Sequence, residues 1–257
     1  MYRALGLAAA SALLSAQLAS AADLPTKAPA AVPAPAVYNW TGFYIGGQVG
    51  GGWASSTTTN VDASASFPAG FVQNAVDPSG ALGGVYGGYN YQWGQLVLGI
   101  DGDYSWAKLT GSGADPAVFN PPRTSDVALH NEKINWVATV TGRLGYAWNN
   151  WMLFVKGGGA WARFEGNTSL IRTVGATTTT IGVANSSETR DGWIVGTGLE
   201  WGITPNWTAK IEYDYIGFST ANFTSTNTNL LNGTTQVLAR SATSHLNIAK
   251  IGVAYKF

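Results

Sequence analysis

The C-terminal stretch His245-Leu-Asn-Ile-Ala-Lys-Ile-Gly-Val-Ala-Tyr-Lys-Phe257 decides the fold. Counted back from the last residue, every second side chain is apolar: Phe257, Tyr255, Val253, Ile251 and Ala249. The alternate row carries two charges, and it consists of Lys256, Ala254, Gly252 and Lys250. A period of two residues is typical of a β-strand with two different faces.

Other segments repeat this alternation, and the sequence offers no helices to cover their apolar faces. Lipid is the simplest surrounding for so many apolar faces, with the polar faces turned into a closed barrel. We therefore predict an all-β fold, a membrane-spanning antiparallel up-and-down β-barrel.

The composition fits one domain and excludes several classes of protein. Charged residues make up 11% of the 257 residues, less than half of the usual ~25%. The formal net charge is zero, which argues against a nucleic-acid partner. The chain has no cysteine, so it holds neither a disulfide scaffold nor a cysteine-based metal site.

The first 38 residues predict export. Residues 1–22 read as a signal peptide, with Arg3 before a small-and-apolar run and Ser20-Ala21-Ala22 before a cleavage point at Asp23. Residues 23–38 are rich in proline and alanine and predict an extended periplasmic linker. The barrel domain then occupies residues 39–257.

Alternating segments and turns predict about eight strands, an even number as in single-chain bacterial barrels. The expected strands are residues 41–53, 81–92, 96–108, 134–148, 152–164, 191–203, 207–218 and 245–257. Tight turns alternate with four long loops, expected at residues 55–79, 110–131, 165–190 and 219–243. Short turns on the periplasmic side and long loops outside are the topology of an outer-membrane barrel, so we expect both termini in the periplasm.

The tryptophans fall at strand ends and predict two interfacial belts, because an indole ring favours the membrane–water interface. The turn-side belt would be Trp40, Trp93, Trp148, Trp151, Trp201 and Trp207. The loop-side belt would be Trp53, Trp106, Trp136, Trp161 and Trp193.

The inward rows hold balanced charges, which predict an interior charge network. Its members are Asp101, Asp103, Arg143, Lys156, Glu200, Lys210, Glu212, Asp214, Lys250 and Lys256. The interior of an eight-stranded barrel is just wide enough for side chains to fill, which favours a plug of ion pairs over a polar path for ions. Inward glycines such as Gly46 and Gly196 point the other way if they leave space, or they ease the curvature of a small barrel.

Three stretches together resemble a known family. They are the signal ending in Ala-Ala-Asp-Leu-Pro, Tyr38-Asn-Trp-Thr-Gly-Phe-Tyr-Ile-Gly-Gly47, and the final Val-Ala-Tyr-Lys-Phe257. They are similar to the small outer-membrane immunogenic proteins of alpha-proteobacteria, which are grouped with opacity-type porin-family barrels. The resemblance implies an eight-stranded barrel inserted by the outer-membrane assembly machinery, with Tyr255 and Phe257 as the assembly signal. It also implies links to envelope integrity, surface recognition, haem binding or weak porin activity.

Little in the sequence predicts catalysis, a metal site or a cofactor. His130 and His245 would both lie near the loop-side rim, and Ser125 and Asp126 are close to His130 in sequence. The sequence has no catalytic motif that spaces a nucleophile, a base and an orienting group. Two solvated rim histidines are therefore favoured over a rim enzyme, a metal site or a haem site. Asp101 and Asp103 could bind a cation, but a structural ion pair is favoured.

We therefore expect a non-enzymatic outer-membrane protein with a structural and surface-interaction role. The alternative is a porin for small solutes, and a rim enzyme or haem binder is a remote third possibility. The expected partners are outer-membrane lipid, lipopolysaccharide, the assembly machinery and an extracellular ligand of the loops. The sequence leaves open whether the chain is a monomer or a homo-oligomer.

Overall fold

A computed structural model describes residues 38–63, 68–73, 75–116, 126–231 and 233–257. The predicted signal peptide and all of the predicted linker except Tyr38 lie outside the described residues. Within the described part there is no helix that is long and apolar enough to cross a membrane.

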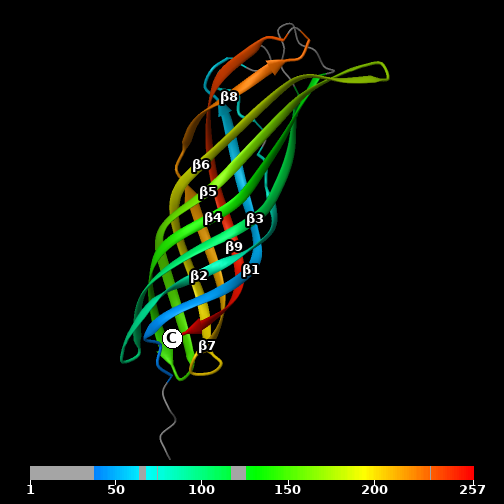
Figure 1. The fold of residues 1–257 in the computed structure, drawn as a ribbon. Helices are drawn as coiled ribbons and strands as arrows, with labels where there is room; N and C mark the ends of the chain where they lie inside the picture. The colour runs from blue at the N-terminus through cyan, green and yellow to red at the C-terminus, as the bar shows by residue number, and fades with distance from the viewer. Residues whose placement is uncertain (1–37, 64–67, 74, 117–125, 232) are drawn as a thin grey trace, which may run out of the picture. The chain divides into compact units, whose positions relative to one another are not determined.

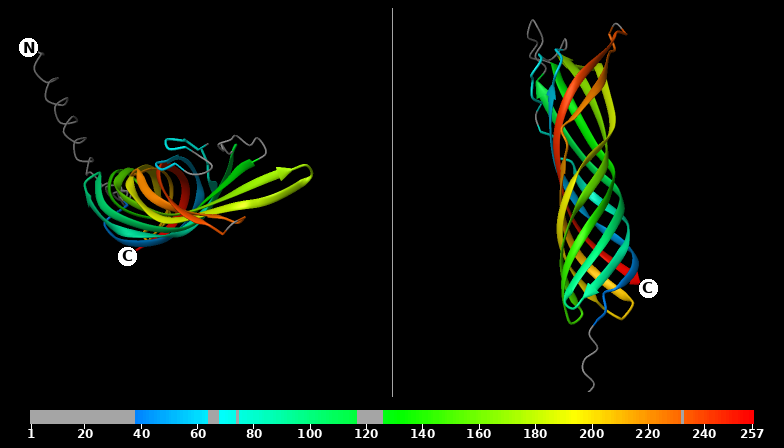
Figure 2. Two further views of the ribbon diagram at one scale, coloured as in Figure 1. Left: turned by 90° about the horizontal axis from the view of Figure 1, so that it is seen from above. Right: turned by 90° about the vertical axis from the view of Figure 1, so that its left-hand side faces the viewer.

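The described residues form nine antiparallel strands, most of which join into a ring (Figures 1 and 2). In chain order they are β1 (Gly42–Asn60), β2 (Ser79–Trp93), β3 (Leu96–Pro116), β4 (Asp126–Trp148), β5 (Trp151–Val174), β6 (Thr177–Gly202), β7 (Trp207–Phe218), β8 (Ala221–Asn229) and β9 (Thr235–Lys256). The order around the ring is β1-β2-β3-β4-β5-β6-β7-β9, and pairing of β1 with β9 closes it. The predicted closed up-and-down barrel is confirmed.

The ninth strand arises because one wall position is shared by two strands. β7 ends at Phe218, and its place between β6 and β9 is then taken by β8. Residues 245–255 of β9 pair with β7, and residues 235–242 of β9 pair with β8. The ring therefore remains eight strands wide at both levels.

Tight turns close one end of the barrel, which we call the turn end; the opposite end is the far end. The turns lie between β2 and β3, between β4 and β5, and between β6 and β7. Gly94 has a φ of 62° and Asn149 a φ of 52°, in the left-handed region that glycine and asparagine tolerate in such turns. Figure 1 shows the C-terminus at the turn end.

At the far end the strands run well past the length needed to cross a bilayer. β6 has 26 residues and β5 has 24, whereas a membrane crossing takes about 9–11. The predicted loop at residues 165–190 is wrong, because β5 and β6 continue through it to a two-residue turn at Gly175. Residues 219–243 are largely strand too, and so are parts of the other two predicted loops.

A β-bulge shifts the two faces of β4. The register of β4 with β5 slips between Ile134 and Val137, and both of these side chains are buried. The extra residue means that the predicted outward position of Ile134 is wrong, although Val140 and Leu144 do face outward.

Candidate functional site

The interior of the barrel is filled in successive layers, and the first closes the turn end. The residues that precede β1 enter the barrel there, and Trp40 is only 1% exposed. It packs with Val97, Ala147, Met152 and Phe154, and its backbone N–H donates to Oε1 of Gln92 over 2.8 Å. The predicted place of Trp40 in a surface belt is therefore wrong.

Lys256 belongs to this turn-end layer and not to an ion pair. Its ammonium group donates to the backbone carbonyl of Asn39 and lies 4.6 Å from the centre of the Tyr38 ring. Lys256 thus holds the entering segment against the end of β9.

The next layer is built around Arg143. Its Nη2 lies 2.5 Å from Oε2 of Glu200, and its Nη1 donates to the hydroxyl of Tyr44 over 3.1 Å. That hydroxyl donates in turn to Oδ2 of Asp101 over 2.6 Å. The guanidinium also lies 4.4 Å from the centre of the Phe154 ring. Asp101 therefore accepts a hydrogen bond from a tyrosine, as part of a network that spans the lumen.

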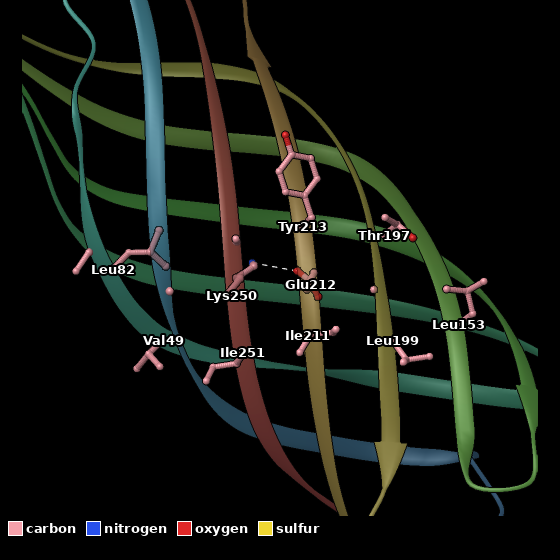
Figure 3. A pocket seen from close by; sticks show the side chains of 14 residues that line it. Val49, Leu82, Leu153, Thr197, Leu199, Ile211, Glu212, Tyr213, Lys250 and Ile251 are labelled. Atoms are coloured by element: carbon pink, nitrogen blue, oxygen red, sulfur yellow. Dashed lines mark ion pairs between the residues drawn. The ribbon is translucent and has the colours of Figure 1, made fainter.

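The third layer sets three lysines against three carboxylates: Lys156, Lys210 and Lys250 against Asp103, Glu212 and Asp214. Lys250 lies 2.9–3.1 Å from an oxygen of each carboxylate, and Figure 3 shows its ion pair with Glu212. Thr139 donates to Asp103 over 2.6 Å. Charges buried this deeply persist only when they are paired, and here the layer balances.

Inward glycines make room for these long side chains instead of leaving an open bore. A Cβ on Gly196 would collide with Oδ1 of Asp214 and lie 3.1 Å from Cε of Lys156. A Cβ on Gly88 would lie 2.6 Å from the hydroxyl of Tyr44. The space beside these glycines is occupied by the networks themselves.

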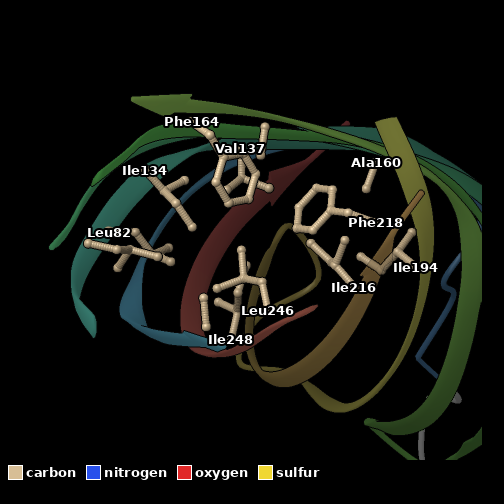
Figure 4. Close-up of a cluster of buried hydrophobic side chains, with 13 residues drawn as sticks. Leu82, Ile134, Val137, Ala160, Phe164, Ile194, Ile216, Phe218, Leu246 and Ile248 are labelled. Carbon is tan, nitrogen blue, oxygen red and sulfur yellow. The ribbon is translucent and has the colours of Figure 1, made fainter. Parts of the chain in front are cut away.

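Beyond the charges lies an apolar layer that sequence reasoning missed (Figure 4). Along the inward row of β7, Asp214 is followed by Ile216 and Phe218, and along β9 Lys250 is followed by Ile248 and Leu246. Phe164 meets Phe218 edge to face at 5.1 Å between ring centres. The signal was present in the sequence, because the inward rows of β7 and β9 turn from polar to apolar toward the far end.

Together these layers pack the lumen from the turn end to beyond its middle. All ten residues of the expected charge network are buried, at 8% exposure or less. The structure brings nine of them into the two charged layers and places Lys256 at the turn end. A hydrated ion would have to displace both ion pairs and packed hydrocarbon to pass.

A polar chamber lies above the apolar layer. Arg190 lies over the Phe164 ring at 4.3 Å, bonds to Glu188 and donates to Oγ of Ser244 over 2.6 Å. The Ser244 hydroxyl donates to Ser56 over 2.9 Å. Phe164, Glu188 and Arg190 are among the residues that line a cavity of about 60 Å³ here.

The two histidines lie on opposite faces of the wall. His130 is buried in the chamber, with Nδ1 3.0 Å from the Thr168 hydroxyl and Nε2 3.1 Å from Oδ2 of Asp115. Burial lowers the pKa of His130 below its usual 6.5, against the opposing pull of Asp115. His245 is exposed and stacks on Tyr215 at 5.9 Å.

Two members of the rim grouping imagined from sequence, His130 and Asp126, lie among the described residues. Asp126 is held by Arg172 through contacts of 2.9–3.2 Å, and Ser125 lies outside the described residues. The partners of His130 come from β3 and β5, and no spacing in the sequence marks Asp115 or Thr168 as its neighbours.

Comparison with known proteins agrees with this architecture. The model of the family described as "Outer membrane protein beta-barrel domain" matches residues 6–257. The chain belongs to this outer-membrane β-barrel family. Its location is the cell outer membrane, as predicted.

Curated relatives of this outer-membrane β-barrel protein come from alpha-proteobacteria. The 31 kDa outer-membrane immunogenic protein of Brucella melitensis is 29% identical over 251 residues, which are 93% of each chain. The 25 kDa outer-membrane immunogenic protein of Brucella canis is 28% identical over 89% of this chain and 84% of its own. The 22 kDa outer membrane protein of Rhizobium leguminosarum is 26% identical over 72% of this chain and 67% of its own. The predicted resemblance to the immunogenic proteins is confirmed.

Solved barrels give more distant matches. OprG of Pseudomonas aeruginosa aligns with a TM-score of 0.47 at 10% identity, covering 85% of this chain and 97% of its own. The outer membrane protease OmpT of Escherichia coli aligns with a TM-score of 0.47 at 12% identity, covering 84% of this chain and 97% of its own.

The outer face of the barrel is the surface that meets lipid. Nine tryptophans are exposed on it: Trp53, Trp93, Trp106, Trp148, Trp151, Trp161, Trp193, Trp201 and Trp207. Trp136 is half-buried and stacks on Tyr104 at 5.8 Å. Tyr255 and Phe257 are also exposed, at the turn end.

A shallow depression of about 890 Å³ lies on this outer face, and Figure 3 shows the side chains around it. Its exposed lining is mainly aliphatic, with Val49, Leu153, Ile211 and Ile251, and it also includes Thr197 and Tyr213. Such a mainly apolar surface suits acyl chains.

Proposed function

We propose that this protein is a closed outer-membrane barrel with a structural role, and that it makes contacts outside the cell through its far end. The observation that carries the proposal is the filled lumen, in which two charged layers are backed by the packed layer around Phe164 and Phe218. Packed protein interiors have the density of organic crystals and leave little room for water. A non-enzymatic role is part of the same proposal.

The far end supports the surface role because it is built from paired strands. Long strands hold the tip of the β5–β6 hairpin and β8 beyond the belt formed by Trp106, Trp161 and Trp193. Short turns typically lie in the periplasm and long connections outside, so we place the far end on the cell surface. The proposed partners of the protein as a whole remain lipopolysaccharide, an extracellular ligand and the assembly machinery.

Conductance of the refolded protein in a planar bilayer tests the closed lumen. We expect no reproducible steps from protein whose folding is verified by a heat-dependent shift in gel migration. Stable steps whose ion selectivity changes in Lys156→Gln or Glu200→Gln would overturn the proposal and support the porin alternative. Lys133→Gln is the matched control, because Lys133 is exposed on the outer side of β4.

The orientation can be tested separately because the natural chain has no cysteine. We expect Val174→Cys, at the far-end hairpin, to react with a membrane-impermeant maleimide on intact cells. Pro205→Cys, in an exposed turn at the other end, should react only after the outer membrane is permeabilised. The reverse pattern would contradict the proposed placement.

A further inference from the structure

The far-end chamber contains a buried guanidinium group that is paired with no carboxylate of the described residues. Arg240 lies on the inward row of β9, opposite Asn60 of β1 and Phe223 of β8, and is 7% exposed. None of the ion pairs between described residues includes it. Burial lowers the pKa of Arg240. The guanidinium nevertheless stays charged, because arginine is not deprotonated in proteins.

The carboxylates nearest to this chamber are already engaged. Arg190 is paired with Glu188: its Nε and Nη2 lie 2.6 Å and 2.5 Å from Oε1 of Glu188. Glu132 interacts with Ser56, and burial raises the pKa of Glu132, which disfavours its negative charge. Asp115 lies against His130. Arg240 is therefore a basic side chain of the chamber that no ion pair between described residues neutralises.

The chamber also contains buried hydrogen-bond donors that have no acceptor among the described residues. The Nε of Arg240 and the Nε2 of Gln73 are buried without a hydrogen-bond partner, and both side chains line the same cavity. Beside them, Asn60 is 2% exposed, and both its amide nitrogen and its amide oxygen are without a partner among the described residues. Buried donors are almost always satisfied in native proteins, so these groups call for an acceptor.

The cavity has the right size for one small group. Its volume of about 60 Å³ is several times the ~10–15 Å³ that one water occupies, and far below the ~300–1,000 Å³ of sites for larger organic molecules. The adjacent N–H groups of a guanidinium form a fork that matches the two oxygens of a carboxylate, phosphate or sulfate.

We propose that the far-end chamber binds one small oxyanion, which accepts hydrogen bonds from the Arg240 fork and from the Gln73 amide. The oxyanion is either a free ion or the terminal acidic group of a larger extracellular molecule. This site does not depend on whether the lumen conducts.

The test is a titration of the folded full barrel in detergent micelles with acetate, sulfate and glucuronate at constant ionic strength kept with chloride. The readout is the NMR resonance of the Arg240 Nε–H, with calorimetry as the binding measurement. We expect a saturable shift with acetate or sulfate. An equal response to glucuronate assigns the site to terminal acidic groups, whereas its absence assigns it to free ions.

Three variants make the result decisive. We expect Arg240→Gln to abolish saturable binding, and Arg240→Lys to weaken it at least tenfold because lysine keeps the charge but lacks the fork. Arg163→Gln is the matched control, since Arg163 lies on the outward row of β5 and should leave binding unchanged. If Arg240→Gln does not fold, Arg240→Lys carries the test alone. Binding that is absent in the unaltered protein, or unchanged in Arg240→Lys, would overturn the proposal.

Discussion

Replacing Lys250 with methionine tests whether the balanced charge layer stabilises the barrel. The ammonium group of Lys250 lies 3.1 Å from Asp103, 3.1 Å from Glu212 and 2.9 Å from Asp214. Methionine has a similar length and shape, so the substitution removes the charge without opening a large cavity. It leaves one buried negative charge without compensation.

Removing one partner of a buried ion pair costs about 3–5 kcal/mol, and we expect this loss in the free energy of unfolding of Lys250→Met. The measurement is urea-induced unfolding in phospholipid vesicles, followed by tryptophan fluorescence and gel migration. Lys133→Met is the control at an exposed site, where we expect a change within about 0.5 kcal/mol.

The double variant Lys250→Met/Asp214→Asn restores the balance of charge in the layer. It should therefore recover most of the stability that the single variant loses. The reasoning is refuted if Lys250→Met costs less than about 1 kcal/mol, the range of an exposed pair, or if the double variant is no more stable than the single one.

Three further predictions concern the chamber, the glycines and the C-terminus. Burial holds the pKa of His130 below 6.5 in the folded state, so the contribution of His130 to stability is complete above pH 6.5 and is lost as the pH falls through the folded pKa. Unfolding midpoints measured from pH 7.5 downward should show this loss. An unchanged pH profile in His130→Gln would contradict it. Gly196→Ala should cost about 1–3 kcal/mol through overpacking against Asp214 and Lys156, while Gly142→Ala, whose Cβ would meet nothing within 4 Å, should be silent in the same unfolding assay. Deleting Phe257 should lower the amount of protein that inserts into the outer membrane, and unchanged surface levels on blots would count against its role as an assembly signal.

The ring and its inward charges could be predicted because a period of two is a local property of the chain. Alternation around Lys250 and Glu212 assigns each side chain to a face, and tight turns such as Asn149-Asn150 fix where neighbouring strands begin. The family resemblance agrees with the barrel that these patterns indicate.

The far half of the barrel could not be predicted in the same way. The bulge between Ile134 and Val137 reverses the faces of β4, and nothing local in the sequence marks an extra residue of this kind. Threonine-rich stretches such as residues 177–180 read as solvated loop, although threonine is also favoured in strands. The contacts of His130 depend on register between three strands, which alternation alone does not specify.

The filled lumen has a consequence for how much of this protein a cell could carry. Each open pore adds to the leakiness of an outer membrane, so the number of open pores is limited by the need to exclude toxic solutes. A barrel plugged by its own ion pairs and by the hydrocarbon around Phe164 and Phe218 escapes this limit. Its copy number could rise to cover much of the cell surface while permeability stayed constant.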